Sequence, residues 1–273
     1  MTEIPKHYYL LRLSFLGFRF QGWQQQPKTK SIEGMLLKTM KFVLPGRSVK
    51  LLGAGRTDAR VSALDFVCQL ILRGAPLSDL DAFRDETNRN LPPDLKLMTV
   101  TSVSKDFNAI RDSKSKTYRY YFSFGAKPHP FCAPFLGYFS GSLDIERMKK
   151  AASVFEGTHN FQSFIVQPGP SSRLERTITR CVLSRNEGLS ASFFPEKTYC
   201  LDVTGPGFGR NQVRLMVAAL VAVGRGEYDQ ESLKKALLTG ESTGIKHIAP
   251  ASGLHLMEVQ MEFPHSFFVI FDR

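Results

Sequence analysis

The sequence predicts an α+β fold with mainly antiparallel sheets. Helix and strand patterns do not alternate regularly enough for a doubly wound parallel sheet, and strand patterns over 189–194 and 198–204 are joined by a turn-length connection that suits antiparallel pairing. Each half resembles a split β-α-β unit whose helices cover one sheet face, which leaves the other face free to bind a partner. At 273 residues a single core begins to split, so we expect a boundary near residue 105.

The sequence of the first half predicts strands and helices in the order β-α-β-α-β. Ser31 is a plausible N-cap for a helix that Pro45-Gly46 ends, and a second helix opens at Ser78 and ends before Leu91-Pro92-Pro93. Between the first strand and the first helix lies a glycine-containing loop with the single tryptophan, Trp23. The strand patterns of this half cover 8–15, 65–72 and 96–103.

The second half predicts several strands and three helices. Helical spacing covers 144–155, 211–223 and 230–237. Strand patterns cover 117–124, 176–185, 189–194, 198–204, 253–263 and 266–271.

The charge balance favours a polyanionic partner. Lys and Arg number 36 against 25 Asp and Glu, which gives a formal charge of +11. The apolar run over 215–223 is about half of the roughly 20 residues that a membrane-spanning helix needs, so no membrane association is expected. Residues 1–10 have no pattern of a secretory signal, and we expect a cytoplasmic protein.

The cysteines and histidines do not suggest a metal site. Cys68, Cys132, Cys181 and Cys200 form no C-x-x-C pair, and the six histidines show no H-E-x-x-H or H-x-x-x-H spacing. We therefore expect no metal cofactor and interpret the cysteines as reduced thiols packed in the interior.

The segment 53–60, GAGRTDAR, is the most informative short motif. Its two glycines allow a tight turn, and Arg56 and Arg60 flank Asp58 at two residues' distance. Nearby positive charge should lower the pKa of the Asp58 carboxyl and keep it ionised, which suits a nucleophile or an electrostatic stabiliser. The alternative is a structural loop aspartate that caps a helix or pairs with arginine.

The segment 107–121, FNAIRDSKSKTYRYY, interleaves cations with tyrosines. Such a combination supplies phosphate contacts and stacking surfaces for nucleic acid. In a strand, Tyr118 and Tyr120 share one face, and Arg119 and Tyr121 share the other. The alternative is an ordinary strand whose basic residues face water.

The segment 205–210, GPGFGR, imitates the glycine loop of a dinucleotide site. Its spacing is G-x-G-x-G, Pro206 removes a backbone donor, and no acidic strand end follows, so no nucleotide cofactor is expected. In the helix after this loop, Arg210 and Arg214 lie four residues apart on one face. An arginine entering an apolar helix needs a carboxylate partner, and Asp58 is a candidate.

These residues resemble a known family, the TruA-type tRNA pseudouridine synthases. The matching motifs span nearly the whole chain in the family's order. They are Gly17 followed by Gly22-Trp23-Gln24, Gly55-Arg56-Thr57-Asp58, Asn90-Leu91-Pro92, Tyr118-Arg119-Tyr120, Glu156-Gly157-Thr158-His159-Asn160-Phe161 with Ser163-Phe164, Arg176-Thr177-Ile178, Gln212-Val213-Arg214, and Ala249-Pro250-Ala251 with Gly253-Leu254.

The resemblance implies the pseudouridine-synthase fold, with two ferredoxin-like halves over 1–105 and 106–273 that flank a basic active-site cleft. It also implies a homodimer that isomerises uridines in the anticodon arm of tRNA, at positions 38, 39 and 40, without metal or nucleotide cofactor. Asp58 then matches the catalytic aspartate, Tyr118 the active-site tyrosine, and Arg214 the arginine that pairs with the aspartate. RNA contacts are expected from Arg56, Arg60, Arg111, Lys114, Lys116 and Arg210.

The chain departs from the family pattern around this site. Arg60 and Ser62 stand where glycine and often histidine are usual, Leu16 replaces an acid, and Ile110 stands where arginine is common. These departures bear on target position and tRNA choice. The alternative function is a non-catalytic RNA-binding or tRNA-folding protein on the same fold, which would not need a carboxylate in a cleft that attracts phosphate.

Overall fold

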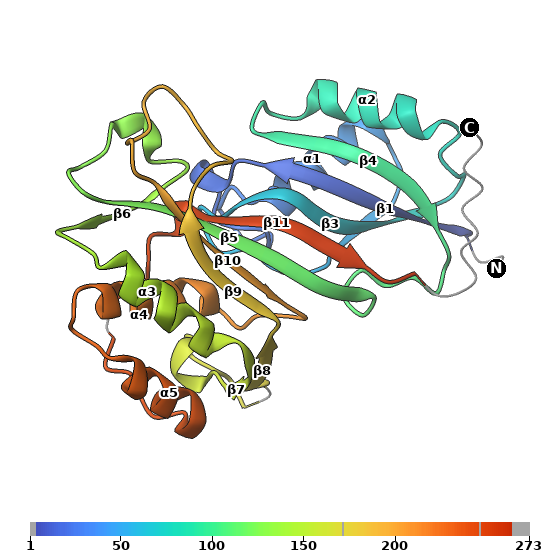
Figure 1. Cartoon of the computed structure of the whole chain (residues 1–273). Helices are drawn as coiled ribbons and strands as arrows, with labels where there is room; N and C mark the ends of the chain where they lie inside the picture. The colour runs from blue at the N-terminus through green and yellow to red at the C-terminus, as the bar shows by residue number, and fades with distance from the viewer. Residues whose placement is uncertain (1–3, 171, 246, 264–273) are drawn as a thin grey trace.

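The computed structural model describes residues 4–170, 172–245 and 247–263 (Figure 1). Within these residues, nine strands belong to one sheet. Its order is β4 (Leu95–Val103), β1 (Lys6–Phe15), β3 (Ser62–Arg73), β11 (Leu254–Met261), β5 (Ser113–Gly125), β10 (Tyr199–Gly205) and β9 (Arg180–Arg185), with β2 (Val49–Gly53) on β3 and β6 (Gly137–Ser140) on β5. A separate pair is formed by β7 (Gly157–Asn160) and β8 (Glu175–Ile178).

Strand β11 occupies the middle of the large sheet although it comes last among the described strands. It pairs in parallel with β3, through His255 with Ser62 and Leu256 with Ala63, and antiparallel with β5. Strands from before residue 105 lie on one side of β11, and strands from after it lie on the other. Apart from the β3 to β11 and β5 to β6 pairs, the described ladders are antiparallel, so the α+β prediction is confirmed.

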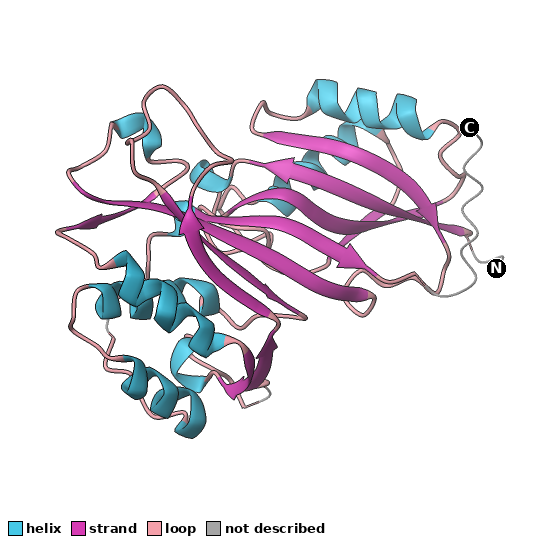
Figure 2. Cartoon of the chain, in the orientation of Figure 1, coloured by secondary structure: helices cyan, strands magenta, loops and turns pink. Residues whose placement is uncertain are grey.

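Helices α1 (Ile32–Val43) and α2 (Leu80–Asn90) lie beside the first four strands (Figure 2). The Ser31 hydroxyl accepts the Gly34 N–H at 3.2 Å, as its N-cap position predicts. For α2 the predicted N-cap, Ser78, is wrong by one residue. The carboxylate of Asp79 accepts the Ala82 N–H at 2.9 Å instead, and a carboxylate also interacts well with the positive end of the helix.

Helices α3 (Ile145–Ala152), α4 (Gln212–Gly224) and α5 (Gln230–Thr239) gather near β9 and the β7–β8 pair (Figure 1). Helix α4 is buried along most of its length, which its apolar sequence requires. None of the described helices is long and apolar enough to cross a lipid bilayer. The four cysteines are buried and unpaired, as expected.

Two strand predictions are wrong. The pattern over 176–185 is two strands in different sheets, β8 and β9, because the chain breaks at Thr179, whose N–H donates to the Thr204 carbonyl. The pattern over 189–194 is a loop, because the Asn186 side chain accepts the Gly188 and Leu189 N–H groups and folds the backbone into a turn. On the side away from β5, β10 therefore pairs with β9.

The short strands β2, β6 and β7 were not predicted, since four or five residues carry little periodicity. The strand predicted over 253–263 is β11, and the one predicted over 266–271 lies outside the described residues.

Candidate active site

The loop that joins β2 to β3 carries Asp58 and is fixed by the segment between β1 and α1. The Trp23 N–H donates to the Thr57 carbonyl at 3.2 Å, and the Trp23 ring stacks on Phe66 with centroids 4.2 Å apart. Gly22 has φ +87°, and a Cβ there would lie 2.4 Å from the Thr57 carbonyl oxygen. The family-like Gly22-Trp23 pair therefore sets the path of the loop that carries the carboxylate.

Asp58 meets Arg214 from the first turn of α4. Arg214 Nη1 lies 3.6 Å from Asp58 Oδ2, with 16% and 31% of the two side chains exposed. The guanidinium is oriented by two further acceptors, since its Nε donates to the Ala249 carbonyl at 2.7 Å and its Nη1 donates to Asn211 Oδ1 at 2.7 Å. The sequence argument that an arginine in this helix needs a carboxylate partner is borne out by this contact.

The pKa of Asp58 moves opposite to the sequence prediction. Burial raises the pKa of this carboxyl above its usual value, and the charges of Arg214 and Arg210 only partly oppose that rise. The predicted lowering by Arg56 and Arg60 is wrong, because both side chains are exposed to water, which screens their charge. Asp58 is therefore a half-buried carboxylate whose ionised form is less well solvated than it would be on an open surface.

Tyr118 of β5 lies in the same neighbourhood. Its ring is buried and meets Phe208 edge to face, with centroids 5.1 Å apart. Burial, and after it the charge of Asp58, raises the pKa of the Tyr118 phenol far above its usual value. Tyr118 is thus a neutral phenol at physiological pH.

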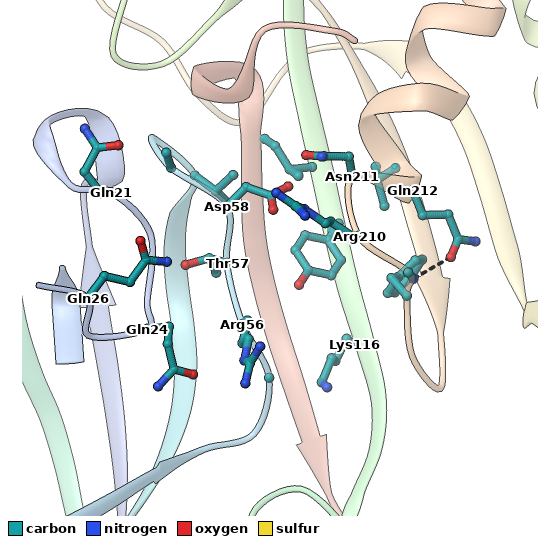
Figure 3. Close-up of a pocket in the computed structure, with 18 of the residues that line it drawn as sticks. Gln21, Gln24, Gln26, Arg56, Thr57, Asp58, Lys116, Arg210, Asn211 and Gln212 are labelled. Atoms are coloured by element: carbon teal, nitrogen blue, oxygen red, sulfur yellow. Dashed lines mark hydrogen bonds between the residues drawn. The ribbon is translucent and has the colours of Figure 1, made fainter. Parts of the chain in front are cut away.

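Asp58 and Tyr118 line a cavity of about 760 Å³ between the Asp58 loop, the loop before α4 and β5, and Arg214 lies behind Asp58 and does not line it (Figure 3). Arg56, Lys116 and Arg210 line it, and Figure 3 shows Arg210 reaching toward Asp58. Of the other expected RNA contacts, Arg60, Arg111 and Lys114 do not line it. Arg111 is engaged by Asp112, with Nε 2.6 Å from Oδ1.

Comparison with known proteins identifies the family. A family model described as tRNA pseudouridine synthase matches residues 151–264. A tRNA pseudouridine synthase A of Limosilactobacillus reuteri (strain DSM 20016) is 32% identical over 253 residues, which cover 92% of this chain and 95% of that protein. The chain belongs to the tRNA pseudouridine synthase A family.

Relatives with the same name in Geotalea uraniireducens (strain Rf4) and Acetivibrio thermocellus (strain ATCC 27405) are also 32% identical, over 249 and 250 residues. In both cases the match covers 91% of this chain and 97% of the relative. Members of the tRNA pseudouridine synthase A family are isomerases that act on tRNA uridines.

The departures from the family pattern fit the loop geometry. Arg60 has φ +67°, a left-handed backbone that glycine adopts without strain, and its guanidinium lies 5.7 Å from the centre of the Phe18 ring. Ser62 Oγ accepts the Gly17 N–H at 2.9 Å in the interior. Ile110 is 57% exposed, and the Leu16 N–H donates to the Asp94 carbonyl. All four residues thus differ from the pattern without displacing Asp58 from Arg214.

Sequence reasoning missed much of the polar lining. It comprises Gln21, Gln24, Gln26, Thr29, Thr57, Asn211 and Gln212. The sequence did carry a signal for three of them, because the matched motifs included Gln24, Thr57 and Gln212. The 205–210 loop, set aside as an imitation of a dinucleotide site, contributes Phe208, Gly209 and Arg210 to the cavity.

Proposed function

We propose that the protein isomerises uridine to pseudouridine in the anticodon arm of tRNA, at positions 38, 39 and 40, with Asp58 as the nucleophile. The observation that carries this proposal is that Asp58, paired with Arg214, lines a cavity together with Tyr118 in a member of this family. A protein that only bound RNA would gain nothing from a buried carboxylate there, since it repels phosphate.

The reaction breaks the bond between ribose C1′ and uracil N1 and forms one between C1′ and C5. The C5 hydrogen leaves as a proton and N1 gains a proton, so substrate and product are isomers. Asp58 attacks ribose or base as a carboxylate, and the fragments stay trapped in the cavity while the uracil rotates. Because a paired uridine cannot be reached inside a helix, it must first flip out, which costs a few kcal/mol.

Arg214 holds Asp58 ionised in its poorly solvated position, since its charge opposes the rise that burial imposes on the Asp58 pKa. Tyr118 offers a ring on which the uracil stacks. Because burial raises the pKa of its phenol, Tyr118 acts through its ring and its hydroxyl and not as a phenolate base.

Arg56 is exposed at the cavity, which supports its role in filling the space that the flipped uridine leaves. Lys116 and Arg210 bind the RNA within the cavity. We assign to the exposed Arg60, Arg111 and Lys114 more distant contacts along the tRNA.

We further propose that residues 1–105 and 106–273 are two ferredoxin-like halves flanking a basic cleft, and that the enzyme is a cytoplasmic homodimer. The order of the sheet supports the two halves, because β11 separates the strands of the first from those of the second.

The test uses tRNA transcripts that carry tritium at uracil C5. The wild-type protein should release tritium into water, and Asp58→Ala should release none, while both should bind tRNA with similar affinity. Chemical mapping of pseudouridine then gives the positions. Binding without release from any tRNA by the wild-type protein would reject the isomerase and favour an RNA-folding role.

A further inference from the structure

Strand β8 carries an arginine against the glycine loop that borders the cavity. A Cβ on Gly205 would lie 2.6 Å from the Thr177 carbonyl oxygen, so the loop runs directly against β8. A Cβ on Gly207 would lie 3.7 Å from Arg176 Nη1. The guanidinium of Arg176 therefore reaches the same loop that contributes Phe208 to the cavity lining.

Among the residues that the structure describes, Arg176 has no partner of opposite charge. Its Nε is buried and makes no hydrogen bond, and no carboxylate of the described residues lies within 4.0 Å of its guanidinium. A half-buried guanidinium is normally compensated by an acid, because burial of an unpaired charge is costly. Burial lowers the pKa of Arg176, and the charge of another cation, the exposed Arg173, lowers it further.

Lys116, on β5, is a second cation beside the glycine loop that has no acidic partner among the described residues. Its ammonium group lines the cavity and donates one hydrogen bond, to the Ala54 carbonyl at 2.8 Å, which leaves two of its three N–H groups free. Burial lowers the pKa of Lys116, and the charge of Arg176 lowers it further. Lys116 pairs in register with Gly205, at the start of the loop that Arg176 contacts, so the two cations repel each other and an anion between them would relieve that repulsion.

We propose that Lys116 and Arg176 together bind one backbone phosphate of the RNA, next to the target nucleotide. The assignment rests on the proposed function, which supplies a polyanionic substrate at this cavity. Arginine offers paired donors and lysine a point charge, a combination that suits a phosphate. Lys116 and Tyr118 share one face of β5 about 7 Å apart along the strand, so the phosphate lies beside the base and not on it.

The first experiment compares two arginines that differ in this contact. Arg176→Gln and Arg173→Gln remove the same charge three residues apart, and tRNA affinity is measured for each over a series of salt concentrations. We expect Arg176→Gln to weaken binding about tenfold and to reduce the slope of log affinity against log salt by about 1. Arg173→Gln should change both much less. Equal effects of the two variants would mean general electrostatic attraction and would overturn the assignment.

The second experiment asks which phosphate is bound. Anticodon stem-loop RNAs are prepared with a single uncharged methylphosphonate linkage on the 5′ or the 3′ side of the target uridine. One linkage should weaken binding to the wild-type protein but add little to the loss in Arg176→Gln, since both changes remove one contact. If each methylphosphonate weakens binding to Arg176→Gln as much as it weakens binding to the wild-type protein, the site does not bind an RNA phosphate. That result would also be obtained if Arg176 and Lys116 bound only a free anion.

The third measurement separates this role from a structural one. If Arg176 serves the fold, Arg176→Gln should lower the Tm of the free protein. If Arg176 serves to bind an anion, the variant should melt at the wild-type temperature or above it, because the substitution removes the repulsion between Arg176 and Lys116. Failure of the proposed function is a separate result, since it would appear as absence of tritium release from the wild-type enzyme whatever Arg176→Gln does.

Discussion

Two arginine–aspartate pairs, Arg119 with Asp202 and Arg214 with Asp58, differ in how completely they are formed. Arg119 meets Asp202 of β10 through two hydrogen bonds, Nε to Oδ1 at 2.6 Å and Nη2 to Oδ2 at 2.9 Å. Arg214 meets Asp58 through one contact of 3.6 Å. Because neighbouring residues of a strand face opposite ways, Arg119 points away from the side on which Tyr118 lies near Asp58.

The difference separates a structural carboxylate from a reactive one. Both oxygens of Asp202 are occupied by Arg119, and the bond raises the pKa of that guanidinium. Asp58 keeps free lone pairs, and burial destabilises its ionised form and so raises its pKa. In the proposed mechanism, incomplete pairing leaves the Asp58 carboxylate free to attack, whereas complete pairing commits Asp202 to the sheet.

Replacing Asp58 or Asp202 by asparagine should show the largest difference between the two pairs. We expect Asp58→Asn to lower the rate of tritium release by a factor of about 1000 or more, because an amide is a poor nucleophile. Asp202→Asn should keep nearly the wild-type rate but lose roughly 2 kcal/mol of unfolding free energy, since it weakens a charge-assisted pair. Denaturant titration and the tritium assay measure the two effects. Loss of activity in folded Asp202→Asn would remove the distinction.

Asn211 tests whether the loose pair depends on its supports. Asn211 has φ +57° and its Oδ1 accepts the Arg214 Nη1 hydrogen bond, so Asn211→Gly removes the amide while it keeps the backbone unstrained. We expect kcat to fall about tenfold with a smaller change in KM. The rate of an ionised nucleophile falls as pH drops through its pKa. Less help from Arg214 raises the Asp58 pKa, so this acid limb should move to higher pH. An unmoved limb would contradict the positioning role.

His255 belongs to the structural side, since it pairs in register with Arg119 and its ring meets Tyr121 at 5.2 Å. Burial lowers the pKa of His255 to about 4, below the value of about 6.5 in the unfolded chain. The neutral ring therefore contributes stability that is present above pH ~6.5 and is lost as pH falls toward 4, on the order of 3 kcal/mol. His255→Phe should flatten this dependence of unfolding free energy on pH. An unchanged profile would assign the acid sensitivity to other groups.

Arg60 should give the smallest effect, although it stands two residues from Asp58. Arg60→Gly removes the strain of a left-handed arginine, about 1 kcal/mol, but adds a similar loss of chain entropy and ends the contact with Phe18. We expect the Tm to shift by no more than about 3 °C and the rate to change less than about twofold. A β-branched control, Arg60→Val, should be clearly destabilised. A large loss of activity in Arg60→Gly would mean that its guanidinium acts at the target nucleotide and not at a more distant point of the tRNA.

The sequence predicted the long elements and the central pair for physical reasons. Helix α1 is bounded by a capping serine and a Pro-Gly stop, and the need of a helix-embedded arginine for an acid linked Arg214 to Asp58 across more than half the chain. Such signals are local or follow from the cost of unpaired charge. Strands as short as β6 and β7 give no such signal, because neighbouring strands and not their own residues hold them.

The other features that the sequence did not predict depend on which residues lie side by side in the folded chain. The direction of the Asp58 pKa shift depends on burial, which sequence proximity to Arg56 and Arg60 did not reveal. Arg176 was part of a matched motif, yet only the packing of β8 against the glycine loop brings it near Lys116. Conversely, Arg111 lies in the most basic segment of the chain but turns to Asp112.

The central position of β11 also determines when the enzyme can exist during its synthesis. The strand that joins β3 to β5 is translated after every other described strand, so the ribosome must reach residue 261 before the ladder can close. Until then the first residues of β3, Ser62 and Ala63, have no partner on the edge that β2 leaves uncovered, and the strands of the Asp58 half and of the Arg214 half are not joined in one sheet. A growing chain therefore cannot modify tRNA while it is still being made, and ribosome-bound fragments should depend on chaperones to protect that edge.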